Sequence, residues 1–397
     1  MSCEGCATDK LKLITSVFLN ITQACNLKCK YCFVQQEPRH MTYEEARDVV
    51  HFVAQNAQIQ GDKPSINYFG GEPTLMWDSI IVPLTKYIRE VYGKGYSISM
   101  TSNGILLDEE KLEWMKKNDV GLLFSIDGDK STQDLNRPLQ SGGSSFEILK
   151  DRIPIILKYF PNMTFRATID HDNAQNMLHN FEFALSQGYN NVFMIPNVFV
   201  DWFEEEVQAL QDGVGLIADI ELMRLRKGQR IALNPLAETF SKIKRINQAE
   251  EANAFRDQAK NHPAFGRCGM GANRFASVGP GGVLYSCQEL VGNDNHGKEF
   301  IIGNIYTGVD EQKRRDIINR FDPRNVISTS GKTCKDCKLN RICEGGCVIN
   351  NYFATGNLNV MPEIMCIWNQ TLLEEAIRIT NIMGAEKNEF FKRTYMR

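Results

Sequence analysis

Residues 16–32 read SVFLNITQACNLKCKYC, an apolar run followed at once by three closely spaced cysteines. The run Ser16–Ile21 predicts a β-strand. Three thiolates on one short loop can hold three irons of a [4Fe–4S] cluster and leave the fourth iron without a protein ligand. A zinc knuckle is the alternative, but structural zinc sites use four ligands. The loop carrying Cys25, Cys29 and Cys32 offers no histidine or fourth cysteine, so the stretch predicts an iron–sulfur site directly after a strand.

Alternating strand-like and helical stretches continue from this strand to about residue 196. The other predicted strands are Ser65–Phe69, Tyr96–Thr101, Gly121–Ile126, Thr164–Ile169 and Asn191–Ile195. Helical stretches between them include Tyr43–Gln55, Asp78–Val91, Asp108–Lys117 and Asn173–Ser186. Six strands alternating with helices predict an α/β fold built of parallel βαβ units, a (β/α)6 partial TIM barrel. Catalytic residues of such barrels lie at the carboxyl ends of the strands, so the residues after each strand are the candidates for a site.

The remaining chain divides by composition. Residues 201–258 are helical and charged in character, and glycine, cysteine and turn residues dominate from 265 onward. Val278–Cys287 predicts a hairpin with its turn at Gly279–Gly282, and Asn369–Ile382 predicts a closing helix. We therefore expect four parts. They are an N-terminal Cys-x2-Cys segment (1–13), the barrel (14–200), a helical bridge (201–260) and a small cysteine-rich domain with a hairpin and helices (261–397).

Charge and hydropathy narrow the class of protein. The 397 residues carry a net charge of -3 and no basic stripe, which argues against nucleic acid or a membrane surface as partner. No run of 18 apolar residues and no signal-peptide segment is present, so we expect a cytoplasmic protein. Disulfides are disfavoured in the cytoplasm because it is a reducing compartment. The 12 cysteines are therefore expected to be mainly metal ligands, while Cys3 and Cys6 are interpreted as a mobile thiol pair whose spacing would also suit a metal.

The cysteine motif and the strand ends together resemble the radical S-adenosylmethionine (SAM) superfamily. The second strand is followed by Gly70-Gly71-Glu72-Pro73, which matches the family's GGEP motif. The resemblance implies that the open iron chelates SAM, whose cleavage gives a 5′-deoxyadenosyl radical. It also implies SAM contacts from the residues at and after the cysteine loop and the strand ends, namely Tyr31, Gly70, Gly71, Glu72, Ser102, Asn103, Ser125 and Arg137.

Individual roles follow from the same resemblance. Tyr31 would pack on the adenine, the glycine backbone would approach the methionine amino group, and Glu72 would accept from it. Arg137 would meet the SAM carboxylate, as an arginine does in sulfatase maturases, although a solvated surface charge is its alternative. Arg166 lies inside a predicted strand and either faces the barrel or caps it.

The C-terminal cysteines resemble the SPASM domain, which carries two auxiliary [4Fe–4S] clusters. A zinc-binding module is the alternative. The resemblance assigns the distal cluster to Cys334, Cys337, Cys343 and Cys366, and the proximal cluster to Cys268, Cys287 and Cys347. Together with Cys25, Cys29 and Cys32 this implies three [4Fe–4S] clusters.

Two positions depart from the sulfatase-maturase pattern. Arg274 stands where those enzymes have a further cysteine, so the proximal cluster is expected to keep an open iron that a substrate thiolate can bind. Water, Cys3, Cys6 or a non-cysteine side chain is the alternative occupant of that position. Gln288 stands where they have a proton-accepting aspartate. Glu289 is the next candidate base, but on an extended strand it would point to the other side.

The sequence thus predicts a radical SAM oxidoreductase that matures a cysteine-containing ribosomal peptide, most specifically by thioether crosslinking. Formylglycine formation and carbon–carbon crosslinking are the alternatives within the family. A non-catalytic iron–sulfur or zinc scaffold is the alternative from another class. An external electron donor such as flavodoxin or ferredoxin is an expected partner.

Overall fold

The computed structural model describes residues 11–251, 274–292, 297–322, 325–337, 339, 343 and 345–396. Cys3, Cys6 and Cys268 lie outside these ranges, as does the predicted boundary between bridge and cysteine-rich domain near residue 260. None of the helices in the described ranges combines the length and apolar character needed to cross a membrane.

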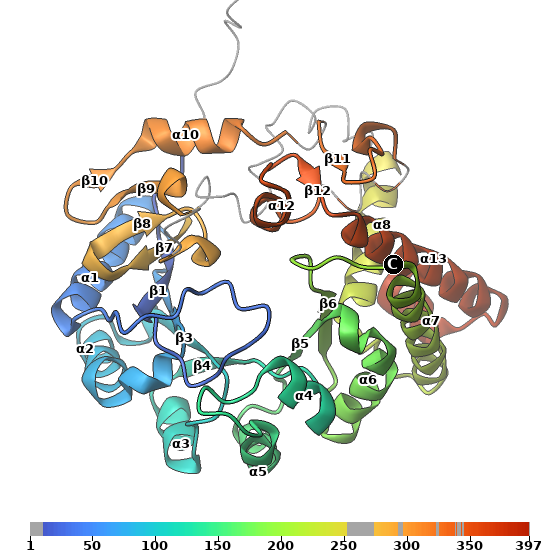
Figure 1. Cartoon of the computed structure of the whole chain (residues 1–397), viewed down its shortest axis with the longest axis horizontal. Coiled ribbons are helices and arrows are strands. Elements are labelled where there is room, and N and C mark those ends of the chain that lie inside the picture. Colours follow the sequence, from blue (N-terminus) through green and yellow to red (C-terminus); the bar gives the residue numbers. More distant parts are fainter. Residues whose placement is uncertain are drawn as a thin grey trace, which may run out of the picture.

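Six strands form the inner wall of a partial barrel (Figure 1). They are β1 (Ser16–Thr22), β2 (Ser65–Gly70), β3 (Ser97–Ser102), β4 (Val120–Phe124), β5 (Phe165–Ile169) and β6 (Val192–Pro196). Strands β1 to β4 pair in order and in parallel, and β5 pairs in parallel with β6. All six lie within one or two residues of the predicted runs, so the predicted parallel α/β architecture is confirmed.

The barrel wall is interrupted between β4 and β5, which belong to separate sheets. The chain bridges this gap just beyond the end of β4, where the Ile126 amide donates to the Arg166 carbonyl at 3.1 Å. A side-chain carboxylate of the next residue, Asp127, accepts from the amide of Thr168 in β5 at 3.1 Å. The Asp127 side chain thus accepts a hydrogen bond that a backbone carbonyl of a neighbouring strand would otherwise accept.

Helices cover the outer face of this wall (Figure 1). They are α1 (Tyr43–Gln60), α2 (Val82–Tyr92), α3 (Glu109–Lys117), α4 (Lys130–Asn136), α5 (Phe146–Tyr159) and α6 (Met177–Ser186). Capping residues and glycines set where these helices begin and end. Thr42 and Glu45 form a capping box at α1, and Gly61 ends that helix in the left-handed conformation. The predicted helix 78–91 begins instead with a π-helical turn, Trp77–Ile81, because Pro83 sits in the first turn of α2 and has no amide to donate.

The hairpin of the cysteine-rich region extends the barrel sheet. Its strands are β7 (Phe275–Gly279) and β8 (Val283–Tyr285), followed by β9 (Ile301–Asn304) and β10 (Gly308–Val309). The turn lies at Pro280–Gly282, as predicted, and Gly281 and Gly282 take positive φ there. Strand β7 pairs in parallel with β1, so one sheet runs from the barrel into the cysteine-rich region.

Long helices close the ring beside β6 (Figure 1). They are α7 (Glu204–Arg226), α8 (Asn234–Glu251) and α13 (Glu363–Ala385), with α10 (Glu311–Asn319) and α12 (Val348–Thr355) completing the rim. Within the predicted bridge, Glu204–Arg226 and Asn234–Glu251 are helical, and α13 contains the predicted helix Asn369–Ile382. The loop between α7 and α8 is fixed by the buried carboxylate of Glu221, which accepts from the amides of Ala232 and Leu233 at 2.8 Å each.

Candidate functional site

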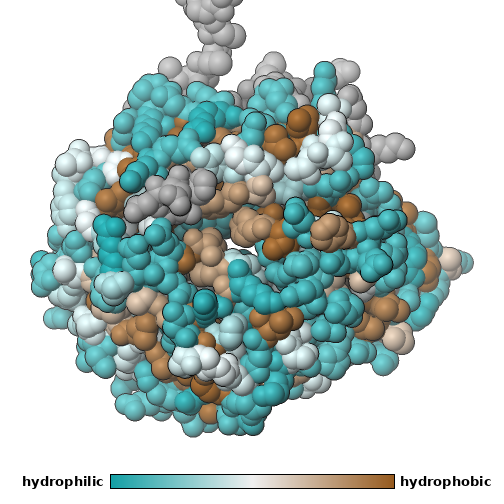
Figure 2. All heavy atoms as spheres, viewed as in Figure 1, coloured by the Kyte–Doolittle hydropathy of each residue, from teal (hydrophilic) through white to brown (hydrophobic). Residues whose placement is uncertain are grey.

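A cavity of about 370 Å³ lies inside the barrel. Figure 2 shows apolar residues gathered around the central hollow of the molecule. The cavity is lined by the cysteine loop, by the ends of β2, β3 and β4, by β5 and β6, and by the segment after β8. Its walls include the predicted site residues Cys25, Cys29, Tyr31, Cys32, Gly70, Gly71, Glu72, Ser102, Asn103, Ser125, Arg137 and Glu289.

The cysteine loop is held by backbone pairing with the segment after α4. Leu27 pairs with Leu139 as an antiparallel bridge. The Lys28 amide donates to the Pro138 carbonyl at 2.9 Å, and the Gln140 amide donates to Asn26 at 2.8 Å. Arg137 belongs to this paired segment, which is why a residue over a hundred positions away in sequence lines the same cavity as the cysteines.

Two of the three thiols lie near N–H groups. The Leu27 amide lies 3.4 Å from Cys25 Sγ, and Arg137 Nη1 lies 4.0 Å from Cys29 Sγ. Burial nevertheless raises the pKa of Cys25 to about 12 and that of Cys29 to about 11. These thiols are therefore protonated unless a metal binds them, because a coordinating metal displaces the proton. Three soft donors on one loop, with N–H groups nearby to stabilise the thiolates, fit a [4Fe–4S] cluster.

The two glycines after β2 are required by close packing against the base of the cysteine loop. A Cβ on Gly70 would lie 2.0 Å from the Thr22 carbonyl oxygen, and one on Gly71 would lie 2.2 Å from that of Ala24. The amide of Gly71 donates to Thr22 at 2.8 Å. This packing alone explains why glycines stand here, and a backbone contact with a methionine amino group stays a prediction.

Glu72 ties the end of β2 to the end of β3. Its Oε1 accepts from the Thr74 amide and the Ser102 hydroxyl at 3.0 and 2.9 Å, and its Oε2 accepts from the Asn103 amide at 2.8 Å. Burial raises the pKa of Glu72, and these hydrogen bonds oppose the rise. Glu72 is thus a structural anchor of the site, and its predicted contact with an ammonium group would come in addition.

Ser102 and Asn103 support the cysteine loop. The Ser102 hydroxyl bridges Glu72 and the Gly104 amide. The Asn103 side chain donates to Asn26 at 2.7 Å and lies 3.8 Å from Cys25 Sγ. Both residues therefore order the wall as well as line it.

Tyr31 and Arg137 meet on the opposite part of the same wall. The guanidinium carbon of Arg137 lies 5.2 Å from the centre of the Tyr31 ring, a cation–π arrangement. Both side chains contact Asp127, which the sequence-based prediction did not select. The signal was available, because Asp127 stands at the end of the fourth predicted strand, two residues after Ser125.

The wall formed by the cysteine-rich region corrects one expectation. Gln288–Leu290 forms a 3-10 turn, so the chain is not extended there, and Gln288 and Glu289 both line the cavity. Burial raises the pKa of Glu289 to about 7, and the positive charge of Arg166 opposes that rise. Arg166 also lines the cavity and stacks on Phe193 at 4.8 Å, so it faces the barrel interior.

Two acceptor atoms on this wall are buried without a hydrogen-bond donor among the described residues. They are Glu289 Oε2 and Asn350 Oδ1, and both residues line the cavity. Buried acceptors without partners are rare in proteins and cost free energy, so they mark positions where a ligand can supply the missing donors.

Arg274 lies at the open end of the hairpin. It directly precedes β7, and the chain leaves β8 two residues before Cys287, so the two residues are at the same end. The Arg274 side chain is 57% exposed and its Nη1 lies 3.6 Å from Asp62. It does not line the cavity, and its predicted place beside an open iron stays a prediction.

The C-terminal cysteines fall into two groups. Cys334, Cys337 and Cys343 lie near Cys366, where burial and these neighbouring thiols raise the pKa of Cys366 to about 12. These are the four residues assigned above to a distal cluster. Cys287 is buried and Cys347 precedes α12, but their predicted partner Cys268 lies outside the described residues.

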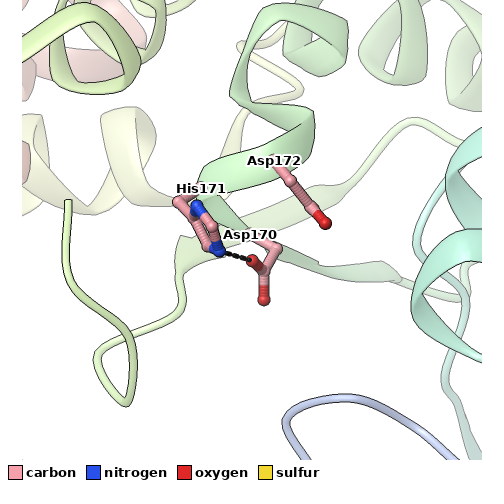
Figure 3. A group of neighbouring side chains, drawn as sticks. All are labelled: Asp170, His171 and Asp172. Atoms are coloured by element: carbon pink, nitrogen blue, oxygen red, sulfur yellow. Dashed lines mark ion pairs between the residues drawn. The ribbon is translucent and has the colours of Figure 1, made fainter. Parts of the chain in front are cut away.

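Asp170, His171 and Asp172 form a compact group after β5 that resembles a cation site (Figure 3). Its members already have protein partners. Asp172 pairs with Lys30 of the cysteine loop at 2.6 Å, and Asp170 accepts from the Asn197 side chain at 2.8 Å. The group therefore braces the cysteine loop against β5 and β6.

Residues 19–184 match the family described as the radical SAM superfamily. The chain is 27% identical to the cysteine-type anaerobic sulfatase-maturating enzyme of Clostridium perfringens, over 82% of this chain and 86% of that one. The identification made from the motifs is thus confirmed, and residues 19–184 form a radical SAM domain.

Solved structures of the same fold include peptide complexes. The native enzyme anSMEcpe with bound AdoMet and the Cp18Cys peptide has a TM-score of 0.70 and 18% identity, covering 93% of this chain and 99% of that one. Streptococcus suis SuiB bound to the precursor peptide SuiA has a TM-score of 0.59 and 13% identity, covering 89% and 76%.

Proposed function

We propose that this chain, a radical SAM enzyme, oxidatively modifies a cysteine-containing peptide and that its product is a thioether crosslink. The observation that carries the proposal is one cavity lined both by Cys25, Cys29 and Cys32 and by Gln288 and Glu289. A reaction started at the first wall would therefore take place beside a buried carboxylate. The sulfatase-maturating relative and the two peptide-bound structures of the same fold support a peptide substrate.

The proposed cofactors are SAM and three [4Fe–4S] clusters. Cys25, Cys29 and Cys32 would hold the first. Two auxiliary clusters would be held by Cys334, Cys337, Cys343 and Cys366, and by Cys268, Cys287 and Cys347. When bound, the first cluster and SAM supply a 5′-deoxyadenosyl radical that abstracts a hydrogen atom from the substrate. A flavodoxin or ferredoxin is the proposed external electron donor.

The residues of the first wall would bind and orient SAM. Tyr31 offers a ring face for the adenine, and Arg137 a guanidinium for the carboxylate. Glu72 has hydrogen-bond capacity left on Oε2, which accepts one hydrogen bond, from the Asn103 amide, and can accept a second. Ser125 lies on the cavity wall within the same arc of strand ends.

Glu289 would accept the proton of the substrate thiol. An ordinary cysteine thiol has a pKa near 8.5, and a buried carboxylate with a pKa of about 7 is matched to take its proton near neutral pH. In the crosslinking reaction the thiol proton goes to Glu289. The hydrogen atom of the acceptor carbon would go to the deoxyadenosyl group, a C–S bond would form, and the one electron that the substrate loses would pass to the auxiliary cluster proposed at Cys268, Cys287 and Cys347.

A second candidate is sulfatase-maturase-type oxidation of cysteine or serine to formylglycine. Gln288 cannot accept a proton, which weakens this reaction, but Glu289 lies in the cavity and supplies a carboxylate one residue later. Carbon–carbon crosslinking would need neither a thiol nor this base.

Mass spectrometry of the product distinguishes these reactions. The anaerobically reconstituted enzyme would be incubated with SAM, reductant and a cysteine-containing peptide encoded beside it. Thioether formation removes two hydrogen atoms and retains sulfur in a form that thiol reagents cannot alkylate. Formylglycine formation from cysteine removes the sulfur. A product that keeps a free thiol would contradict both.

A further inference from the structure

We propose that Asp127 is a positioning residue that fixes Tyr31 and Arg137 together for SAM binding. The inference rests on the radical SAM chemistry of the barrel and is independent of which peptide the enzyme modifies. Asp127 follows β4, its side chain is fully buried, and it does not line the cavity itself. It would therefore act through its two neighbours, without touching the ligand.

Three hydrogen-bond donors and one charged guanidinium converge on this one carboxylate. Oδ2 accepts from the Tyr31 hydroxyl and from the Asn136 side chain, the latter at 3.0 Å. Oδ1 accepts from the Thr168 amide at 3.1 Å and lies 3.1 Å from Arg137 Nε. A carboxylate can serve all of these groups because it only accepts and carries a negative charge, whereas a neutral amide would present its own N–H groups to some of them.

The two groups that Asp127 holds come from segments far apart in the chain. Tyr31 belongs to the cysteine loop, and Arg137 follows α4. Both line the cavity, and Arg137 also reaches Cys29. One buried carboxylate therefore sets the aromatic face and the positive charge relative to each other and to the cysteine loop.

Stability alone is a poor explanation for this arrangement. Removing a carboxylate and a guanidinium from water costs free energy that their attraction often fails to recover, so buried ion pairs are weak contributors to stability. Asp127 does bridge the gap between β4 and β5 through Thr168, and this is the competing structural role. The experiment has to separate that role from positioning.

Glu221 provides a matched control. It is fully buried, lies 3.3 Å from Arg224 and accepts from two backbone amides at 2.8 Å, but it belongs to α7 and does not line the cavity. Glu221→Gln thus removes the same kind of buried charge away from the site.

The test compares Asp127→Asn, Arg137→Gln, the double variant and Glu221→Gln, all full-length and anaerobically reconstituted. SAM binding is measured by equilibrium dialysis, and the SAM-induced change in the electron paramagnetic resonance spectrum of the reduced protein is the second readout. We expect Asp127→Asn to weaken SAM binding roughly ten- to hundred-fold with iron content unchanged. The double variant should lose less SAM affinity than the sum of the two single losses, because Asp127 acts in part through Arg137. Glu221→Gln should leave SAM affinity unaltered.

Two results would overturn the proposal. The first is a SAM dissociation constant for Asp127→Asn within twofold of the wild type. The second is a double variant whose loss is the sum of the two single losses. If Asp127→Asn folds poorly, Tyr31→Phe becomes the deciding variant. This substitution removes only the hydroxyl that donates a hydrogen bond to Asp127. Unchanged SAM affinity and an unchanged spectrum in Tyr31→Phe would then refute the proposal. Peptide is absent throughout, so failure of the proposed peptide chemistry leaves this test unaffected.

Discussion

The two walls of the cavity differ in how their polar groups are satisfied. On the wall of the cysteine loop and strand ends, Glu72 and Asn103 bond to other protein groups, and Asp127 lies behind this wall, where it accepts from Tyr31 and Asn136. On the wall formed by the cysteine-rich region, Glu289 Oε2 and Asn350 Oδ1 are buried and have no donor among the described residues. The acceptors of the first wall are filled by protein donors, although Arg137 Nε is a donor buried there without a hydrogen-bond acceptor among the described residues, whereas the second wall still has acceptors to fill.

This difference assigns different tasks to the two walls. A ligand that is the same in every turnover is best met by groups fixed in advance, because preorganisation lowers the entropic cost of binding. Unfilled acceptors beside an arginine suit a polypeptide, which brings its own N–H and C=O groups. Changes in the first wall should therefore affect SAM, and changes in the second should affect the peptide.

Loss of all three thiols of the first wall should have the largest effect. Replacing Cys25, Cys29 and Cys32 together with Ala should remove about four of about twelve irons, because three clusters of four irons are proposed. It should also abolish SAM cleavage. Iron analysis and chromatography of 5′-deoxyadenosine check the two results, and any 5′-deoxyadenosine formed by this variant would contradict the site.

Glu289→Gln should break the second wall selectively. Peptide modification should fall by roughly 10²–10⁴-fold, the usual contribution of a general base, while uncoupled SAM cleavage persists. The wild-type rate should rise with pH through about 7, where Glu289 loses its proton and becomes able to accept one. Glu289→Gln should lose this rise of the rate with pH. An identical pH profile in the two proteins would remove Glu289 from the mechanism.

Glu72→Gln should weaken SAM binding at the first wall without loss of iron. The amide would present N–H groups to donors that now bond the carboxylate, so the ends of β2 and β3 should loosen. We expect SAM affinity to drop about tenfold and the melting temperature to fall, with iron content unchanged. Glu221→Gln is the control for affinity. Wild-type SAM binding in Glu72→Gln would show that Glu72 acts on the fold alone.

The smallest effect concerns neither wall. Burial raises the pKa of Glu221 from 4.5 to about 7, so the folded state holds a proton that the unfolded state has released between these values. Stability should therefore fall as pH rises from 4.5 to 7, by roughly 1–3 kcal/mol. Denaturant unfolding at several pH values should show this decline in the wild type. A decline of the same size in Glu221→Gln would mean that another group causes it.

Local patterns explain why the first wall was largely predictable. The three cysteines lie on one loop, and Glu72, Ser102 and Ser125 follow strands whose carboxyl ends meet in any parallel barrel. Spacing and periodicity are properties of the chain itself, so the strands, the hairpin and the closing helix were also predicted closely.

The sequence by itself therefore determined the parallel barrel and the cysteine loop. Only the tertiary structure decided which way Glu289 points, because a 3-10 turn replaced the extended strand expected after Cys287. It also decided that Asp127 would serve Tyr31 and Arg137 together, since that contact depends on the pairing of the cysteine loop with residues 136–140. The physical reason is the same in both cases. Side-chain direction and contacts between distant segments depend on local dihedral angles and packing, which periodicity does not encode.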